Sequence, residues 1–317
     1  MMRFISLAAL LLLTACSAGA PPGADLPTVE ALTANDPYAE ARPISWRNLL
    51  DRPREAADAR IAYGEGEEQY GELWLPDGDG MHPLVIMVHG GCWQAAIPGT
   101  ILQDQLNADL RGRGFAVWNI TYPRLGHETG GYPGTFRSVA AAVDHARALA
   151  AEHPLDLSRS VIMGHSAGGH LALWAGARGR LGPDWVNAPG NEPFIPGAVI
   201  TLAGINDLEA YRETGPGRCG EPGAVELLVD FTARAPDPFA DTSPARLLPL
   251  GVEQVVVSGA LDPIVPPAFG EAYAAAATAA GDDVLEITID QAGHFELIDP
   301  AAPAWAVIMA EIDRVTQ

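Results

Sequence analysis

The amino-acid sequence predicts an α/β fold with a mostly parallel central sheet that is covered by helices on both faces. From about residue 60 onward, strand-like and helix-like segments alternate along the chain. The strand-like segments are continuous apolar runs, such as LVIMVH at 84–89, and do not alternate between polar and apolar residues. Such runs are typical of strands buried on both faces, and their alternation with helices is typical of a parallel sheet.

Each element follows from this pattern in order. We expect strands at 69–75, 84–89, 115–120, 160–163, 197–204, 253–259 and 284–289. We expect helices at about 99–111, 133–151, 167–178, 267–280 and 301–315, the second of them opened by Pro133, because proline is tolerated in a first turn. The interval 205–250 is rich in proline and glycine and contains only short helical pieces. We expect it to form a short lid-like insertion over the carboxyl ends of the strands, where such sheets bind ligands.

The N-terminal residues have the layout of a secretory signal. One arginine precedes an apolar run at 4–13 that is too short to span a bilayer. LTAC at 13–16 resembles a bacterial lipobox, which implies cleavage after residue 15 and lipid modification of Cys16. We therefore divide the chain into a lipoprotein signal peptide (1–15), a flexible tether (16–45) and an α/β domain (46–317). The expected location is the cell envelope, on the periplasmic side of the outer membrane; the alternative is an ordinary signal cut near Ala18 or Ala20, which would release a soluble protein.

Charge and cysteine content limit the partners. The net charge is −21 and the chain contains no lysine, so nucleic acid is not an expected partner and acidic substrates are disfavoured by the overall field. Once Cys16 is lipidated, Cys92 and Cys219 remain. An exported compartment permits a disulfide between them, but the sequence leaves open whether they pair. The oligomeric state is also left open.

The segment GHSAGG at 164–169 indicates a serine held on a tight turn. It follows a strand-like run directly and opens a helix-like one, which is the setting of a nucleophile elbow. Glycines beside Ser166 suit a turn whose backbone is strained and whose helix and strand approach closely. A second turn, HGGCW at 89–93, follows the 84–88 run and can turn backbone N–H groups inward to form an oxyanion hole, or can be a simple tight turn.

A serine needs a base and an acid to act as a nucleophile, and the sequence offers both. Asp262 follows the 253–259 strand and His294 follows the 284–289 strand, so both belong to the same rim as Ser166. Asp207 also follows a strand and is the competing acid, although it can simply cap a short helix. We expect His165 to point away from the serine as a packing residue, and His170 to be structural.

Together these elements, HGG-x-W, GHSAGG, D-x-x-V-P and GHF, resemble the α/β-hydrolase superfamily over about residues 60–315. They are most similar to the branch of small carboxylesterases, kynurenine-formamidase-like enzymes and prolyl-oligopeptidase-related esterases. The resemblance implies Ser166 as nucleophile, His294 as base and Asp262 as the orienting acid. It also implies an oxyanion hole formed by backbone amides of Gly91, Cys92 and Ala167, and no metal or organic cofactor.

The expected function is hydrolysis of carboxylic esters with small or aromatic acyl groups, because the resemblance implies that Cys92 and Trp93 in place of further glycines favour such groups. Alternatives are an arylformamidase or short-peptide hydrolase, and a non-catalytic envelope scaffold. Trp93, Tyr122 and Tyr132 are candidates for the substrate pocket. The expected partners are a small ester or amide substrate and the membrane, the latter through the lipid on Cys16.

Overall fold

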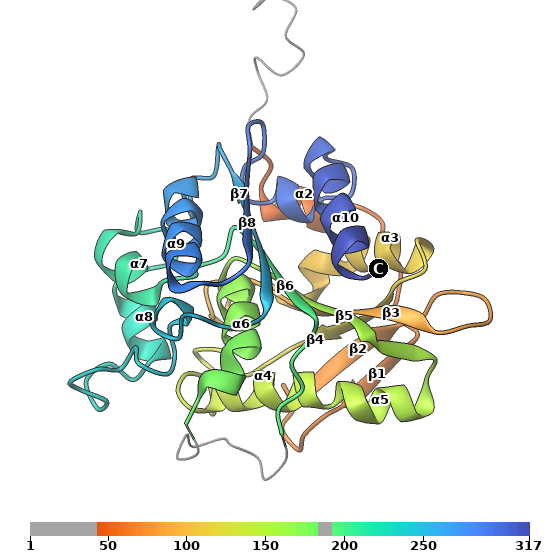
Figure 1. Ribbon diagram of the computed structural model, residues 1–317, viewed down its shortest axis with the longest axis horizontal. Helices are drawn as coiled ribbons and strands as arrows, with labels where there is room; N and C mark the ends of the chain where they lie inside the picture. The colour runs from red at the N-terminus through yellow and green to blue at the C-terminus, as the bar shows by residue number, and fades with distance from the viewer. Residues whose placement is uncertain (1–42, 183–191) are drawn as a thin grey trace, which may run out of the picture. The chain divides into compact units, whose positions relative to one another are not determined.

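The structure, a computed structural model, describes residues 43–182 and 192–317, which belong to one compact unit. The centre of this unit is an eight-stranded sheet with the order β1-β2-β4-β3-β5-β6-β7-β8 (Figure 1). The strands β3 to β8 are parallel, whereas β1 and β2 run antiparallel to their neighbours. Their bounds are β1 Ala59–Ala62, β2 Tyr70–Trp74, β3 His82–Val88, β4 Ala116–Ile120, β5 Leu155–His165, β6 Ala198–Leu202, β7 Glu253–Gly259 and β8 Val284–Ile289.

Helices cover both faces of the sheet, as the sequence predicts (Figure 1). On one face lie α2 (Trp46–Leu50), α3 (Asp104–Gly112) and α10 (Pro303–Val315). On the other lie α4 (Gly134–Asp144), α5 (Ala146–Glu152), α6 (Ala167–Gly176) and α9 (Pro267–Ala280). Strands β3, β4 and β6 are buried almost throughout, which explains their continuous apolar sequences.

The strand order brings two loops together. After β3 the chain passes to β4 on one side and then returns to β5 on the other, so β3 lies between them. Val88 at the end of β3 pairs in register with Gly164 of β5. The HGG turn and the serine turn, which follow these two strands, therefore lie side by side at the carboxyl edge, where open parallel sheets bind ligands.

The expected insertion connects β6 to β7. It contains α7 (Leu208–Thr214), α8 (Gly223–Leu228) and the 3₁₀ helix η3 (Pro244–Arg246). A disulfide between Cys92 and Cys219 attaches it to the HGG turn. The side chain of Gln94 also donates to the carbonyl oxygen of Cys219 at 2.9 Å.

Several elements differ from the sequence prediction. Helix α2 was not predicted, and β5 begins at Leu155, five residues before the predicted strand 160–163. Strand β1 was not predicted, because its four residues are an edge segment without a long apolar run. The expected helix 133–151 is two helices that meet at His145. The first turn of the expected helix 99–111 is a separate 3₁₀ helix, η1 (Thr100–Gln103), ahead of α3.

The signal peptide 1–15, Cys16 and all but the last three residues of the tether 16–45 lie outside the described residues. Within the described ranges, none of the helices has the length and apolar character needed to cross a membrane.

The sheet and the start of α6 are packed closely against each other. A Cβ atom on Gly168 would lie 2.1 Å from the carbonyl oxygen of Val88, and one on Gly164 would lie 2.1 Å from the carbonyl oxygen of Gly168. A Cβ on Gly169 would meet the hydroxyl of Thr201 at 2.5 Å. The obstructing atoms at the first two positions are backbone atoms of the sheet and helix, which cannot rotate away, so these positions exclude a side chain.

We predict that Gly168→Ala lowers the free energy of unfolding by about 3 kcal/mol or more, because the added methyl group forces α6 away from β3. Gly112→Ala in α3 is the matched control: apart from its chain neighbours and the backbone of its own helix, no atom lies within 4 Å of the new Cβ, and alanine favours helix. Urea unfolding of both variants checks the prediction. A Gly168→Ala protein as stable as Gly112→Ala would contradict this account of the packing.

Candidate active site

Ser166 occupies the turn between β5 and α6. Its backbone has φ 57° and ψ −123°, a left-handed conformation that is strained for a residue with a side chain. The N–H of Ser166 donates to the carbonyl oxygen of Leu202 at 2.8 Å, which ties the turn to the end of β6. Ser166 is 2% exposed and lines a cavity. The fold thus holds this serine at the amino end of a helix, where backbone N–H groups lack helical acceptors.

His294 and Asp262 form a buried pair beside this cavity. Nδ1 of His294 donates to Oδ2 of Asp262 at 2.6 Å. The other carboxylate oxygen accepts from the backbone N–H groups of Ile264, at 2.7 Å, and Val265, at 3.0 Å. These bonds fix the carboxylate and, through it, the imidazole ring. Because Nδ1 is engaged, Nε2 is the nitrogen of His294 left for exchange with a substrate.

Asp207, the competing candidate for the acid, does not contact His294. Asp207 is the N-cap of α7, and its carboxylate accepts from the backbone N–H groups of Glu209 and Ala210 at 3.0 and 3.1 Å. It is Asp262 that contacts His294, and Asp207 has the capping role that its position before a short helix allows.

His165 differs from the sequence prediction, which pointed it away from the serine. It lines the same cavity, and its ring centroid lies 4.4 Å from that of His294. Its Nε2 lies 3.0 Å from the carbonyl oxygen of His294, so this nitrogen carries the proton and donates. Burial and the neighbouring His294 hold the pKa of His165 well below its ordinary range. His165 is therefore a neutral donor that fixes the backbone of His294.

The backbone N–H groups of Gly91, Cys92 and Ala167 have no hydrogen-bond acceptor within the described residues. Gly91 and Cys92 have φ values of 109° and 51°, and Trp93 follows at 56°. This run of left-handed residues turns the loop sharply after β3. Gly91 and Cys92 line the cavity together with Ser166, and Ala167 is the first residue of α6. Unpaired donors beside a serine are the arrangement that stabilises an oxyanion.

The side chains of His89 and Tyr122 form hydrogen bonds with the backbone of this loop. Nδ1 of His89 donates to the carbonyl oxygen of Gly90 at 2.7 Å, and the hydroxyl of Tyr122 donates to the carbonyl oxygen of His89, also at 2.7 Å. The two rings stack with their centroids 4.4 Å apart. Burial, with nearby Arg124 as the second cause, lowers the pKa of His89 to about 3, so the ring stays neutral and keeps one donor and one acceptor nitrogen.

A hydrogen-bonded chain connects the same loop to the insertion. The indole N–H of Trp93 donates to Nδ1 of His170 at 3.1 Å, and Nε2 of His170 donates to the carbonyl oxygen of Thr242 at 2.8 Å. Burial lowers the pKa of His170 to about 4, which keeps this two-sided arrangement neutral. His170 is thus structural, as the sequence suggests.

The three aromatic residues proposed for the substrate pocket do not line the cavity. Trp93 and Tyr122 are completely buried and make the structural contacts given above. The hydroxyl of Tyr132 donates to Asp241 at 3.2 Å, and its ring packs against Phe136 and under Arg234. The prediction that these three residues line the substrate pocket was wrong, because all three side chains are used in packing and structural hydrogen bonds.

The cavity itself has a volume of about 190 Å³. Apart from Ser166, His165 and His294, its walls are mostly apolar, and they come from five separate parts of the chain. Sequence reasoning missed these wall residues, because only the folded chain brings them together: Trp46, Ala96, Ile97, Pro98, Leu102, Arg218, Ile264 and Phe295.

Within the described residues, His, Cys, Asp and Glu side chains form no group of three or more that could hold a metal ion. The polar groups at and beside the cavity are those that acyl transfer requires. They are a hydroxyl, an imidazole paired with a carboxylate, and free backbone N–H donors.

Comparison with known proteins places the chain in a family. The BD-FAE family model matches residues 72–276, which is more than half of the 317 residues. The chain belongs to the BD-FAE family. The matched range includes Ser166 and Asp262, whereas His294 follows it.

Two kinds of relative resemble this BD-FAE member. Esterase LipC of Mycobacterium tuberculosis (strain ATCC 25618 / H37Rv) is 26% identical over 273 residues, which are 80% of this chain and 65% of LipC. A solved structure titled bifunctional GH43-CE of Bacteroides eggerthii has a TM-score of 0.68 at 24% identity, over 83% of this chain and 36% of that one. Esterase B of Lactobacillus Rhamnosis (HN001) has a TM-score of 0.70 at 15% identity, over 86% and 90% of the two chains. These likenesses and the strand order confirm the predicted α/β-hydrolase fold.

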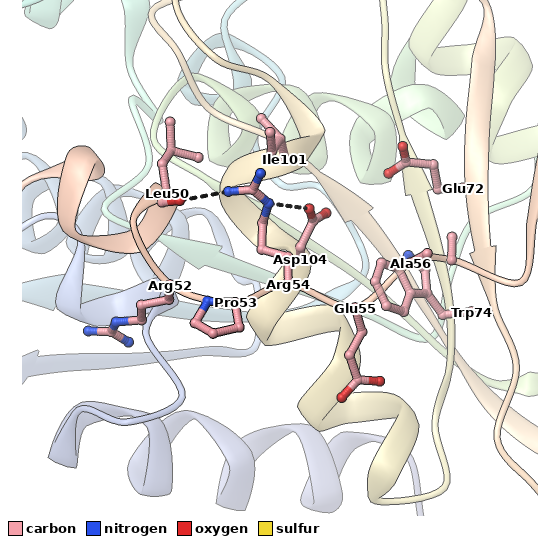
Figure 2. A pocket seen from close by; sticks show the side chains of 11 residues that line it. Leu50, Arg52, Pro53, Arg54, Glu55, Ala56, Glu72, Trp74, Ile101 and Asp104 are labelled. Atoms are coloured by element: carbon pink, nitrogen blue, oxygen red, sulfur yellow. Dashed lines mark hydrogen bonds and ion pairs between the residues drawn. The ribbon is translucent and has the colours of Figure 1, made fainter.

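The BD-FAE domain also carries a second, more open groove, with a volume of about 630 Å³ (Figure 2). There the Arg54 guanidinium lies between the carbonyl oxygen of Leu50 and the carboxylate of Asp104. Burial, with the neighbouring Glu72 as the second cause, raises the pKa of Asp104 to about 7, although Arg54 acts in the opposite direction. Leu50 comes from α2, which also supplies Trp46 to the cavity beside Ser166, and Asp104 is the first residue of α3. None of the groove's own residues lines that cavity.

Proposed function

We propose that this member of the BD-FAE family is a serine hydrolase that cleaves carboxylic esters of small or aromatic acyl groups. The observation that carries the proposal is that Ser166 and His294 face one cavity, with Asp262 bound to the far side of His294. The unpaired N–H groups of Gly91, Cys92 and Ala167 supply the remaining requirement, a site for the oxyanion.

The first half of the reaction forms an acyl-enzyme. Nε2 of His294 takes the proton of Ser166 as Oγ attacks the ester carbonyl carbon. The carbonyl oxygen becomes an oxyanion, which accepts from the free backbone N–H groups. The bond to the alcohol then breaks, and His294 returns its proton to the alcohol oxygen. Asp262 keeps the ring in the correct tautomer and stabilises the imidazolium while the proton is on it.

The second half restores the enzyme. His294 removes a proton from a water molecule as that water attacks the acyl carbon, and the same backbone donors hold the second oxyanion. Collapse of this intermediate breaks the bond to Ser166, which regains its proton from His294. The carbonyl oxygen of His294 accepts from the neutral His165, so the base keeps its position through both halves.

The size and chemistry of the cavity support a small acyl group or one aromatic ring. A cavity of about 150 Å³ lined by apolar side chains is large enough for benzene, and this cavity is slightly larger, at about 190 Å³. Leu102, Ile264 and Phe295 offer apolar surface to such a group. The names of the relatives, Esterase LipC and Esterase B, support ester rather than amide cleavage.

We predict that Ser166→Ala lowers kcat for 4-nitrophenyl acetate by about 10³-fold or more, because no nucleophile remains. Ser158→Ala is the matched control, since Ser158 is exposed at the opposite end of the same strand. Circular dichroism of both variants checks that the fold is kept. Retention of most activity by Ser166→Ala would contradict the mechanism, and faster cleavage of N-formylkynurenine or a dipeptide than of any ester would contradict the assigned substrate class.

The identity of the acid gives a second prediction. Asp262→Asn should lower kcat by about 10³- to 10⁴-fold, because the amide cannot hold His294 in the required tautomer. Asp207→Asn should change kcat less than about threefold, because asparagine caps a helix as well as aspartate does. The two rates are compared on the same ester, and the reverse result would assign the acid to Asp207.

We also propose that the protein is exported and held at the cell envelope by lipid on Cys16. The apolar run and LTAC segment support this, and the Cys92–Cys219 disulfide suits an oxidising compartment. Cys16→Ser should move the protein from the membrane fraction to the soluble fraction of the expressing bacterium. A wild-type protein already found entirely in the soluble fraction would contradict lipid anchoring.

A further inference from the structure

The charge on the cavity wall is concentrated in one side chain. Among the wall residues of the described chain, Arg218 alone carries a permanent charge. His165 donates to the backbone carbonyl oxygen of His294, and Nδ1 of His294 donates to Asp262, as described above. A substrate that enters this otherwise apolar cavity therefore meets one guanidinium.

The loop that carries Arg218 is fixed on both sides of that residue. The carboxylate of Glu221 accepts from the N–H of Gly217 at 2.6 Å and from the N–H of Cys219 at 3.0 Å. Cys219 is bonded to Cys92 in the turn beside Ser166. The backbone at Arg218 is thus attached to the oxyanion-side loop, although the guanidinium remains exposed. The backbone at Arg218 is held in place, while its guanidinium stays free to bind a ligand.

Arg218 differs from most arginines of the described ranges, because no partner for it lies among the described residues. Most arginines in the described ranges lie within ion-pair distance of a carboxylate. No carboxylate, aromatic ring or carbonyl group among the described residues contacts the guanidinium of Arg218. In a chain with a net charge of −21, an unpaired cation facing a cavity keeps its full capacity to bind an anion.

The overall negative charge does not cancel this local effect. At physiological ionic strength, charges separated by more than about 8 Å are largely screened in solvent. The binding free energy of a carboxylate within hydrogen-bond distance of Arg218 is therefore determined mainly by that guanidinium. The guanidinium can donate two parallel N–H hydrogen bonds to the carboxylate. The distant acidic surface slows the approach of an anion more than it weakens the bound state.

We propose that Arg218 is a specificity-determining residue that binds a carboxylate on the substrate, so that the preferred substrates are esters bearing a carboxylate. This inference rests on the proposed ester hydrolase function. The cavity beside Ser166 receives the ester group, and Arg218 holds the charged group at the cavity wall.

The test compares charged and neutral substrates of equal size. One pair, 4-acetoxybenzoate and 4-acetoxybenzamide, puts the charge on the alcohol side of the ester. A second pair, the monoanion of monomethyl terephthalate and methyl 4-carbamoylbenzoate, puts it on the acyl side. The readout is the ratio of kcat/KM for the charged substrate to that for the neutral one. Because each ratio is compared between wild type and variant, intrinsic differences in reactivity between the two substrates cancel.

Arg218→Ala should lower this ratio by about tenfold for at least one pair, and the affected pair identifies which side of the ester carries the charge. Arg218→Lys should retain part of the ratio, and Arg218→Glu should lower it further than alanine does. Raising the salt concentration should reduce the wild-type ratio and leave that of Arg218→Ala almost constant.

Arg180→Ala is the matched control. Arg180 is also exposed and without a partner among the described residues, but it lies beyond the carboxyl end of α6, about 15 Å or more from Ser166. Its removal changes the net charge equally and should leave both ratios unchanged. Equal ratios in wild type and Arg218→Ala for both pairs would overturn the inference. If the wild type cleaves none of the four esters, that result would instead contradict the proposed function.

Discussion

The close approach of α6 to the ends of β3, β5 and β6 is the constraint on which the rest of the site depends. It requires the absence of side chains at Gly164 and Gly168, because backbone atoms occupy the space that a Cβ would need. With the helix this near, the chain must turn within one residue, and that residue is Ser166, with φ 57°. The strain at the turn is thus imposed by the packing of α6 against these strands.

The same packing brings loops from distant parts of the chain into contact, and neutral histidines connect them. His165 donates to the loop of His294, and His170 connects Trp93 to Thr242 in the insertion. Burial keeps the pKa of both side chains below the ordinary range, so neither gains a charge near neutral pH. Each can therefore donate from one nitrogen without placing an unpaired charge in the core. A rigid frame of this kind preorganises the groups around Ser166.

Much of the fold and the central residues of the site could be predicted from the sequence, because they depend on local patterns. Strands β7 and β8 and helix α9 have the bounds that their apolar runs indicate. Asp262 and His294 follow strands that end at one edge, so topology alone brings them near each other.

Other features depend on contacts between segments far apart in the chain. The place of His165 at the cavity, the wall residue Trp46 and the exposed Arg218 carry no local signal. Tyr122 has an aromatic side chain suited to a pocket, yet it is buried under the HGG turn, and only the packed structure distinguishes the two roles.

The central claim is that Ser166 is a nucleophile activated by His294, and covalent labelling tests it most directly. The folded protein is treated with a fluorophosphonate, and the adduct is counted by intact mass and located by peptide mapping. We expect one adduct per chain, on Ser166, with loss of fluoride and none on Ser166→Ala. A protein that stays unlabelled while folded, or that carries the adduct on another residue, would contradict the account.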